Sequence, residues 1–222
     1  MNQTKKYLFI VINLFILITT IIMVTITLIF GSWAARKDGG PFEYWQHIIT
    51  FTILSNIFLG LVTGASAVIG LCRLKSKNFL PRQLLTWYLI AASSAMLTCL
   101  TVIFFLAPVR AASGKDYFDM ILGPMFFLHF FNPILAAITY IFLSGPQKST
   151  LKDRILSILP PTIYAIPYLI NVVFLENWPD FYGITFGGQL IFIPLVFLGF
   201  CTVVFAIASG LSYCHNRQIA IK

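Results

Sequence analysis

The stretch that decides the fold is MILGPMFFLHFFNPILAAITYIFL, residues 120–143. It is apolar over a length that crosses a bilayer, since a spanning helix needs about 20 such residues. His129 lies near its middle, with Asn132 and Pro133 close behind. An ionisable side chain at that depth is costly, and by default it is a candidate for a functional site. The sequence therefore predicts a membrane helix with a functional histidine inside it.

The composition of the whole chain is that of a membrane protein. Of its 222 residues, 59% are hydrophobic and 10% are charged, and the mean hydropathy is +0.89, whereas soluble domains have about 25% charged residues. We expect an all-α fold, a polytopic bundle of six transmembrane helices with short loops that forms a single domain over residues 1–222. The predicted spans are residues 7–30, 44–72, 84–107, 118–143, 155–175 and 187–213.

The distribution of basic residues predicts the orientation. The net charge is +8, but the lysines and arginines lie in short loops between apolar runs, which argues against a nucleic-acid partner. If both termini are cytoplasmic, eleven lysines and arginines fall inside and four fall outside. Cytoplasmic loops carry such an excess, so we expect both termini to be cytoplasmic.

Few polar residues lie deep in the spans, and one group of them is matched in depth to His129. Thr52 and Asn56 are four residues apart and share a helix face, which Ser55 borders. From the predicted span starts and a rise of 1.5 Å per residue, Thr52 and His129 both lie roughly 12–17 Å below the outer boundary. The two side chains can therefore meet if their helices are neighbours.

This pair suggests nucleophilic catalysis. A threonine hydroxyl can attack an ester carbonyl if a neutral histidine accepts its proton, and Asn56 or Asn132 could orient the imidazole or donate to the oxyanion. The alternative stays open, because threonine and serine in membrane helices commonly bond their own helix or hold two helices together. Beside a catalytic Thr52 and His129, the candidate supporting residues are thus Ser55, Asn56 and Asn132.

The remaining polar signals favour structural roles. We expect His47 to pair with Glu43 near the outer interface, and His215 to be solvated. Small residues at Gly60, Gly64 and Gly70 predict a packing face on the second span. We expect no metal and no cofactor, since the sequence has no cluster at ligand spacing, and we expect the four cysteines, Cys72, Cys99, Cys201 and Cys214, to be packing residues.

Four motifs resemble a known family, the androgen-induced/TFPI-regulating membrane proteins. They are FTILSN at 51–56, LHFFNP at 128–133, IYAIPY at 163–168 and WPDFYGITFGG at 178–188. The resemblance covers about residues 44–210 and is strongest to a prokaryotic six-span branch. It implies an intramembrane threonine hydrolase of fatty-acyl esters in a bacterial plasma membrane, with Thr52 as nucleophile and His129 as base.

The residues following both motif positions depart from the animal branch of that family, so the substrate can differ while the machinery is kept. We therefore expect a membrane lipid or acyl ester as substrate. Two other functions fit the sequence, a small-molecule binding or transport subunit and a non-enzymatic structural protein. The first span, NLFILITTIIMVTITLIFG at 13–31, lacks the small-residue docking face that vitamin-capturing transport subunits share, which counts against transport.

Overall fold

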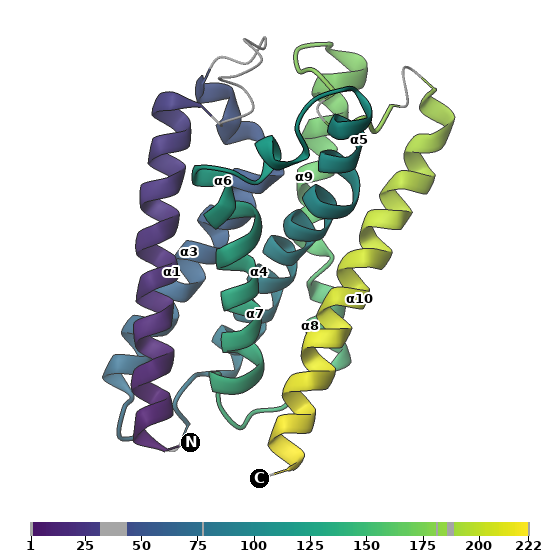
Figure 1. The fold of residues 1–222 in the computed structure, drawn as a ribbon. Helices are drawn as coiled ribbons and strands as arrows, with labels where there is room; N and C mark the ends of the chain where they lie inside the picture. The colour runs from purple at the N-terminus through teal and green to yellow at the C-terminus, as the bar shows by residue number, and fades with distance from the viewer. Residues whose placement is uncertain (1, 32–43, 77, 181, 186–188, 222) are drawn as a thin grey trace.

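The computed structural model describes residues 2–31, 44–76, 78–180, 182–185 and 189–221. These residues form a bundle of long helices, with no strand among them (Figure 1). Six of the helical segments are long and apolar enough to cross a membrane, so the chain is a multi-pass membrane protein. The six segments are Gln3–Phe30, Phe51–Cys72, Arg82–Ala112, Pro124–Leu143, Leu151–Phe174 and Leu190–Ala220.

Several spans consist of more than one helix. The described elements are α1 (Gln3–Phe30), η1 (Tyr44–Ile49), α3 (Phe51–Cys72), α4 (Arg82–Thr101), η2 (Val102–Leu106), α5 (Ala107–Ala112), η3 (Tyr117–Met120), α6 (Pro124–Phe126), η4 (Phe127–Phe131), α7 (Asn132–Leu143), α8 (Leu151–Leu156), α9 (Leu159–Leu169), η5 (Ile170–Phe174), η6 (Leu190–Phe192) and α10 (Ile193–Ala220). Of these, η2, η4 and η5 are π-helical turns.

Two spans, the second and the fourth, begin at least six residues later than the sequence predicts, and both have a local cause. The second span begins at Phe51 because Thr50 is extended and its side chain caps the helix, leaving residues 44–49 as a separate 3-10 turn. The fourth begins at Pro124, since Gly123 has a φ of +66° and a proline is favoured in the first turn. Both breaks leave short non-spanning segments at the same end of the bundle (Figure 1).

The predicted small-residue face on α3 is confirmed, and α1 packs against it. A Cβ added at Gly60 would lie 3.1 Å from the Thr20 side chain, and one at Gly64 would lie 3.0 Å from Leu17. One at Gly70 would lie 2.8 Å from the Phe79 ring. Glycine therefore lets the two helix backbones approach closely, as is common in membranes.

The packing is uneven around the bundle. In the most apolar 18-residue stretch of the third span, which contains α4, 61% of the residues are buried. The corresponding share is 17% in the span of α8 and α9 and 6% in the span of α10. The side of the bundle formed by α9 and α10 is thus mostly surface. The start of α1 and the end of α10 lie at the same end of the bundle (Figure 1).

His215 is not solvated as predicted. It is 1% exposed, and its Nε2 donates to the carbonyl of Gln147 at 2.9 Å. Its ring packs on Tyr140, with centroids 4.9 Å apart. The loop from α7 folds back over the ring and supplies the carbonyl, which a sequence position near an interface does not reveal.

Two further contacts fasten the same part of α10. Ser149 Oγ and Ser212 Oγ lie 2.8 Å apart, and Asn216 bonds both backbone groups of Ser149 at 2.9 Å. The end of α10 nearest the termini is therefore held by hydrogen bonds.

The close packing against the small-residue face of α3 can be tested with a matched pair of glycines. Gly70→Ala should destabilise the protein by about 1–3 kcal/mol, the usual cost of overpacking, because the new methyl group meets Phe79. Gly210→Ala in α10 should be neutral or stabilising, since nothing lies within 4 Å of its Cβ position. Thermal unfolding in detergent checks this, and equal melting temperatures for the two variants would contradict the packing described.

Candidate functional site

His129 lies within the π-helical turn Phe127–Phe131. The N–H of Asn132 bonds the carbonyl of Phe127, five residues back, so the carbonyl of Leu128 loses its helical partner. The Asn56 side chain of α3 donates to that carbonyl at 2.9 Å, and also to the carbonyl of Thr52 at 2.9 Å. The second and fourth spans therefore meet on one amide nitrogen. Such π turns are frequent at functional sites.

The hydrogen bonding of His129 fixes its tautomer. The ring is 6% exposed, and Nδ1 lies 2.7 Å from the carbonyl of Met120. A carbonyl can only accept, so Nδ1 carries the hydrogen, and in a neutral imidazole the other nitrogen is then the acceptor. The only hydrogen bond that His129 makes through its ring to the described residues is the one at Nδ1, so Nε2 is left without one there. His129 thus presents an unused proton acceptor.

Asn132 turns away from this imidazole and holds α7 to α1. Its Oδ1 accepts from the Thr19 hydroxyl at 2.9 Å, and its Nδ2 donates to the Thr20 hydroxyl at 3.2 Å. Both contacts are buried. In the described structure, Asn132 is a link between helices and does not bond His129.

Thr52 lies in the first turn of α3, and its side chain faces a pocket. Beside it, the Ser55 hydroxyl bonds the carbonyl of Thr52 at 3.1 Å and lies 3.2 Å from the Thr98 hydroxyl of α4. Ser55 therefore fastens α3 to α4 at the level of Thr52. The Oδ1 of Asn56 is buried without a partner among the described residues.

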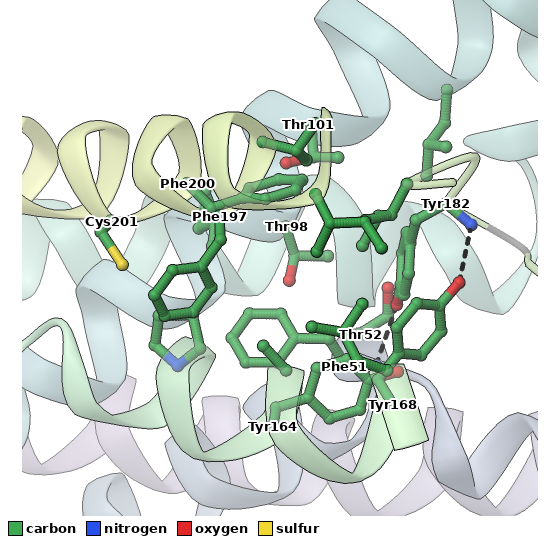
Figure 2. Close-up of a pocket in the computed structure, with 18 of the residues that line it drawn as sticks. Phe51, Thr52, Thr98, Thr101, Tyr164, Tyr168, Tyr182, Phe197, Phe200 and Cys201 are labelled. Atoms are coloured by element: carbon green, nitrogen blue, oxygen red, sulfur yellow. Dashed lines mark hydrogen bonds between the residues drawn. The ribbon is translucent and has the colours of Figure 1, made fainter. Parts of the chain in front are cut away.

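The pocket that Thr52 faces has a volume of about 70 Å³ and lies between α3, α4, α9 and α10 (Figure 2). Apolar side chains form most of its wall, among them Leu97, Phe197 and Phe200. Hydroxyls come from Thr52, Thr98 and Thr101, and from the tyrosines Tyr164, Tyr168 and Tyr182. Apolar walls with a few convergent polar groups are typical of small-molecule sites, but those sites are usually larger, about 300–1,000 Å³.

A short loop, residues 182–185, closes the pocket on the side away from the termini. The Tyr182 hydroxyl accepts from the N–H of Phe51 at 2.9 Å and lies against the amide and hydroxyl of Thr52. Burial raises the pKa of Tyr182 to about 12. The phenol therefore keeps its proton at neutral pH and remains a hydrogen-bond donor beside Thr52.

Asp180 holds this loop in place. Its carboxylate accepts from the Tyr168 hydroxyl at 2.7 Å, from the Thr185 hydroxyl at 2.7 Å, and from the N–H groups of Ile184 and Thr185. Burial raises the pKa of Asp180, but these hydrogen bonds outweigh that effect and leave it below its ordinary value. The carboxylate is thus ionised, and the loop folds around it as a cap.

The structure brings some of the predicted residues together and keeps others apart. Thr52, Ser55 and Asn56 form one cluster, and Asn56 bonds the residue before His129. No hydrogen bond joins Thr52 to His129 in the described part of the chain, and His129 is not in the wall of the pocket. The predicted pairing of His47 with Glu43 lies outside the described residues.

Tyr182 is the site residue that sequence reasoning missed. It reaches Thr52 from a loop 130 positions away, and no local pattern predicts that contact. The proline, glycine and aromatic content of residues 176–188 predicts either a folded-back cap over the outer mouth or an ordinary turn, but it does not single out Tyr182. Among the described residues, no three histidine, cysteine or acidic side chains come together as metal ligands.

Comparisons of the chain with protein-family models, with curated proteins and with solved structures find no match. The site must therefore be interpreted from its own geometry.

The link between α3 and the π turn predicts a stability effect. Asn56→Leu should cost about 1–3 kcal/mol, because it leaves the buried carbonyl of Leu128 without a donor. Asn171→Leu is the matched control, since its side-chain nitrogen bonds only its own helix, at Pro167, and it should change stability much less. Chemical or thermal unfolding in detergent measures both, and equal losses would refute the proposed role of Asn56.

Proposed function

We propose that the protein hydrolyses fatty-acyl esters within the membrane, with Thr52 as nucleophile and His129 as base. The observation that carries this is the Thr52 hydroxyl in the wall of an apolar pocket, beside the hydroxyl of Tyr182. An acyl ester is a ligand with an apolar body and one reactive carbonyl, and this pocket offers the matching surroundings. The resemblance to intramembrane threonine hydrolases supports the same assignment.

The chemistry follows from the groups around Thr52. Its Oγ attacks the ester carbonyl carbon while its proton passes to His129 Nε2, and the tetrahedral intermediate expels the alcohol, which takes the proton back. Tyr182 is the donor for the developing oxyanion, because its phenol stays protonated. Water then attacks the acyl-threonine and gives a proton to His129, and the fatty acid leaves as His129 returns that proton to Thr52 Oγ.

Proton transfer to His129 requires hydrogen-bond reach or one intervening water. The unpartnered Oδ1 of Asn56 is the acceptor that would hold such a water between the two elements that Asn56 joins. Catalytic hydrogen bonds often tighten only when substrate is bound. The Met120 carbonyl accepts a hydrogen bond from Nδ1, so Nε2 remains the proton acceptor at each step of the reaction.

A second candidate is a membrane protein that binds an acyl lipid without cleaving it. The lack of a hydrogen bond between Thr52 and His129 among the described residues favours it. Both functions use the same pocket. The hydrolase requires the Thr52 hydroxyl as nucleophile, whereas the binding protein does not.

We also propose that the protein lies in a bacterial plasma membrane with both termini cytoplasmic. The segments that join α3 to α4 and α7 to α8 lie at the end of the bundle that holds the termini (Figure 1), and they carry Arg73, Lys75 and Lys148. The positive-inside rule assigns that end to the cytoplasm.

The role of Thr52 is tested by a shape-conserving substitution. Thr52→Val should reduce hydrolysis of a long-chain 4-methylumbelliferyl ester to background, because the nucleophile is removed, and Thr52→Ser should retain part of the activity. His129→Gln should lower the rate by about 10²–10⁴-fold, the usual contribution of a general base. Fluorescence of the released alcohol measures the rate in detergent or vesicles.

Thr101→Val is the matched control, because Thr101 also lines the pocket but has no part in the proposed chemistry. It should keep most of the activity. If purified wild-type protein retains the ester uncleaved, and Thr52→Val binds it equally well, the binding function replaces the hydrolase.

The orientation predicts which residues an impermeant reagent reaches in intact cells. A membrane-impermeant maleimide should label Ser113→Cys, which is exposed at the end away from the termini, and should not label Lys75→Cys. Wild-type protein corrects for the native cysteines. Labelling of Lys75→Cys alone would reverse the assignment.

A further inference from the structure

A second cavity lies on the lipid-facing side of the bundle, apart from the Thr52 pocket. It is a groove of about 840 Å³ between α3, α4, α8 and α9. Apolar side chains line most of its length, and several of them are exposed on the surface of the bundle, including Leu54 (41%), Trp87 (53%) and Ile163 (64%). In a membrane, such a surface is in contact with acyl chains.

The length of the groove matches one leaflet of the bilayer. Phe58 and Trp87 contact each other across it, with ring centroids 6.1 Å apart. From there α3 runs to Phe51 at one end of the groove, and α4 runs to Arg82 at the other. At 1.5 Å per residue this is roughly 18 Å, compared with about 15 Å for half of a 30 Å hydrocarbon core.

The end of the groove nearest the termini is charged, and the charge is in excess on the positive side. The charged residues of the wall are Arg82, Lys152 and Asp153. The carboxylate of Asp153 already accepts four hydrogen bonds, from Arg82, from the Thr86 hydroxyl, and from the N–H and hydroxyl of Thr150. Asp153 therefore neutralises one cation, and one positive charge of the wall remains in excess.

Arg82 and Lys152 have hydrogen-bond donors that the described residues do not use. Arg82 bonds Asp153 and Thr150 through Nη2 alone, and its Nη1 is buried with no hydrogen-bond partner among the described residues. A buried donor without a partner costs free energy. Lys152 adds an exposed ammonium group at the same end.

We propose that this groove binds an anionic phospholipid, with its phosphate on Arg82 and Lys152 and one acyl chain along α3 and α4. Basic pockets between membrane helices bind such headgroups, and guanidinium groups suit phosphate oxygens. A free phosphate would use only the charged end, whereas a phospholipid fills the whole groove. The proposal is independent of the ester chemistry at Thr52.

The groove ends against the Thr52 pocket. Phe51 and Tyr164 line both cavities, and their rings pack with centroids 5.3 Å apart. The tail of the bound lipid would therefore end at this aromatic pair, and the headgroup would lie at the opposite end.

The test is native mass spectrometry of the full chain in detergent, with equimolar phosphatidylglycerol and phosphatidylcholine of identical acyl chains. Wild-type protein should retain one phosphatidylglycerol in preference. Lys152→Gln should lower the ratio of the two bound lipids about fivefold, the effect of one basic residue on an anionic lipid. Lys75→Gln, which removes an exposed charge at the same end but outside the groove, should leave the ratio unchanged.

A second pair of variants tests the apolar part. Ile163→Trp fills the groove and should release both lipids, whereas Ile166→Trp, on an exposed position of the same helix outside the groove, should retain them. Equal retention of the two lipids by wild-type protein, or equal effects of Lys152→Gln and Lys75→Gln, would overturn the proposal. Displacement of the bound lipid by inorganic phosphate would also overturn the proposal. The same holds if the protein is found as a dimer without bound lipid.

Discussion

Every backbone polar group in a hydrocarbon core needs a partner within the protein, and the arrangement of this bundle depends on how that need is met. Three π-helical turns among the described residues each free a carbonyl from its own helix. The Asn56 side chain donates to the carbonyl of Leu128, and the Tyr117 hydroxyl donates to that of Ile103 at 3.0 Å. Backbone N–H groups after η5 donate to the carbonyl of Asn171. Each irregular turn thereby becomes a point where two segments are fastened.

The candidate site is built from one of these points. The π turn that frees the Leu128 carbonyl also contains His129, whose ring bonds Met120. The side-chain amide that donates to Leu128 is that of Asn56, which lies on the same helix face as Thr52. Pro133 follows directly and has no N–H to donate to the carbonyl of His129. The geometry of the candidate base and the contact between the two spans therefore have one origin in the backbone.

Composition and apolar length predict the six spans, because membrane insertion depends on those properties alone. The glycine face of α3 is also predictable, since close helix approach requires small residues at a fixed spacing. The π turn at His129, the capping of α3 by Tyr182 and the burial of His215 are not. Each depends on a partner distant in sequence, and a single residue pattern does not say which carbonyl or hydroxyl will be within reach. The Thr150–Asp153 capping box, in contrast, was a readable local signal for the earlier start of the fifth span.

The unequal fastening of α10 has a mechanical consequence. Ser212, His215 and Asn216 clamp it near the end of the chain, whereas the half that walls the Thr52 pocket is held mainly by apolar side-chain contacts and is almost entirely surface. If α10 tilts as a rigid helix about its hydrogen-bonded end, its other end is displaced the most. The largest displacement of α10 therefore falls at the Thr52 pocket, and a tilt of this helix changes the width of the pocket.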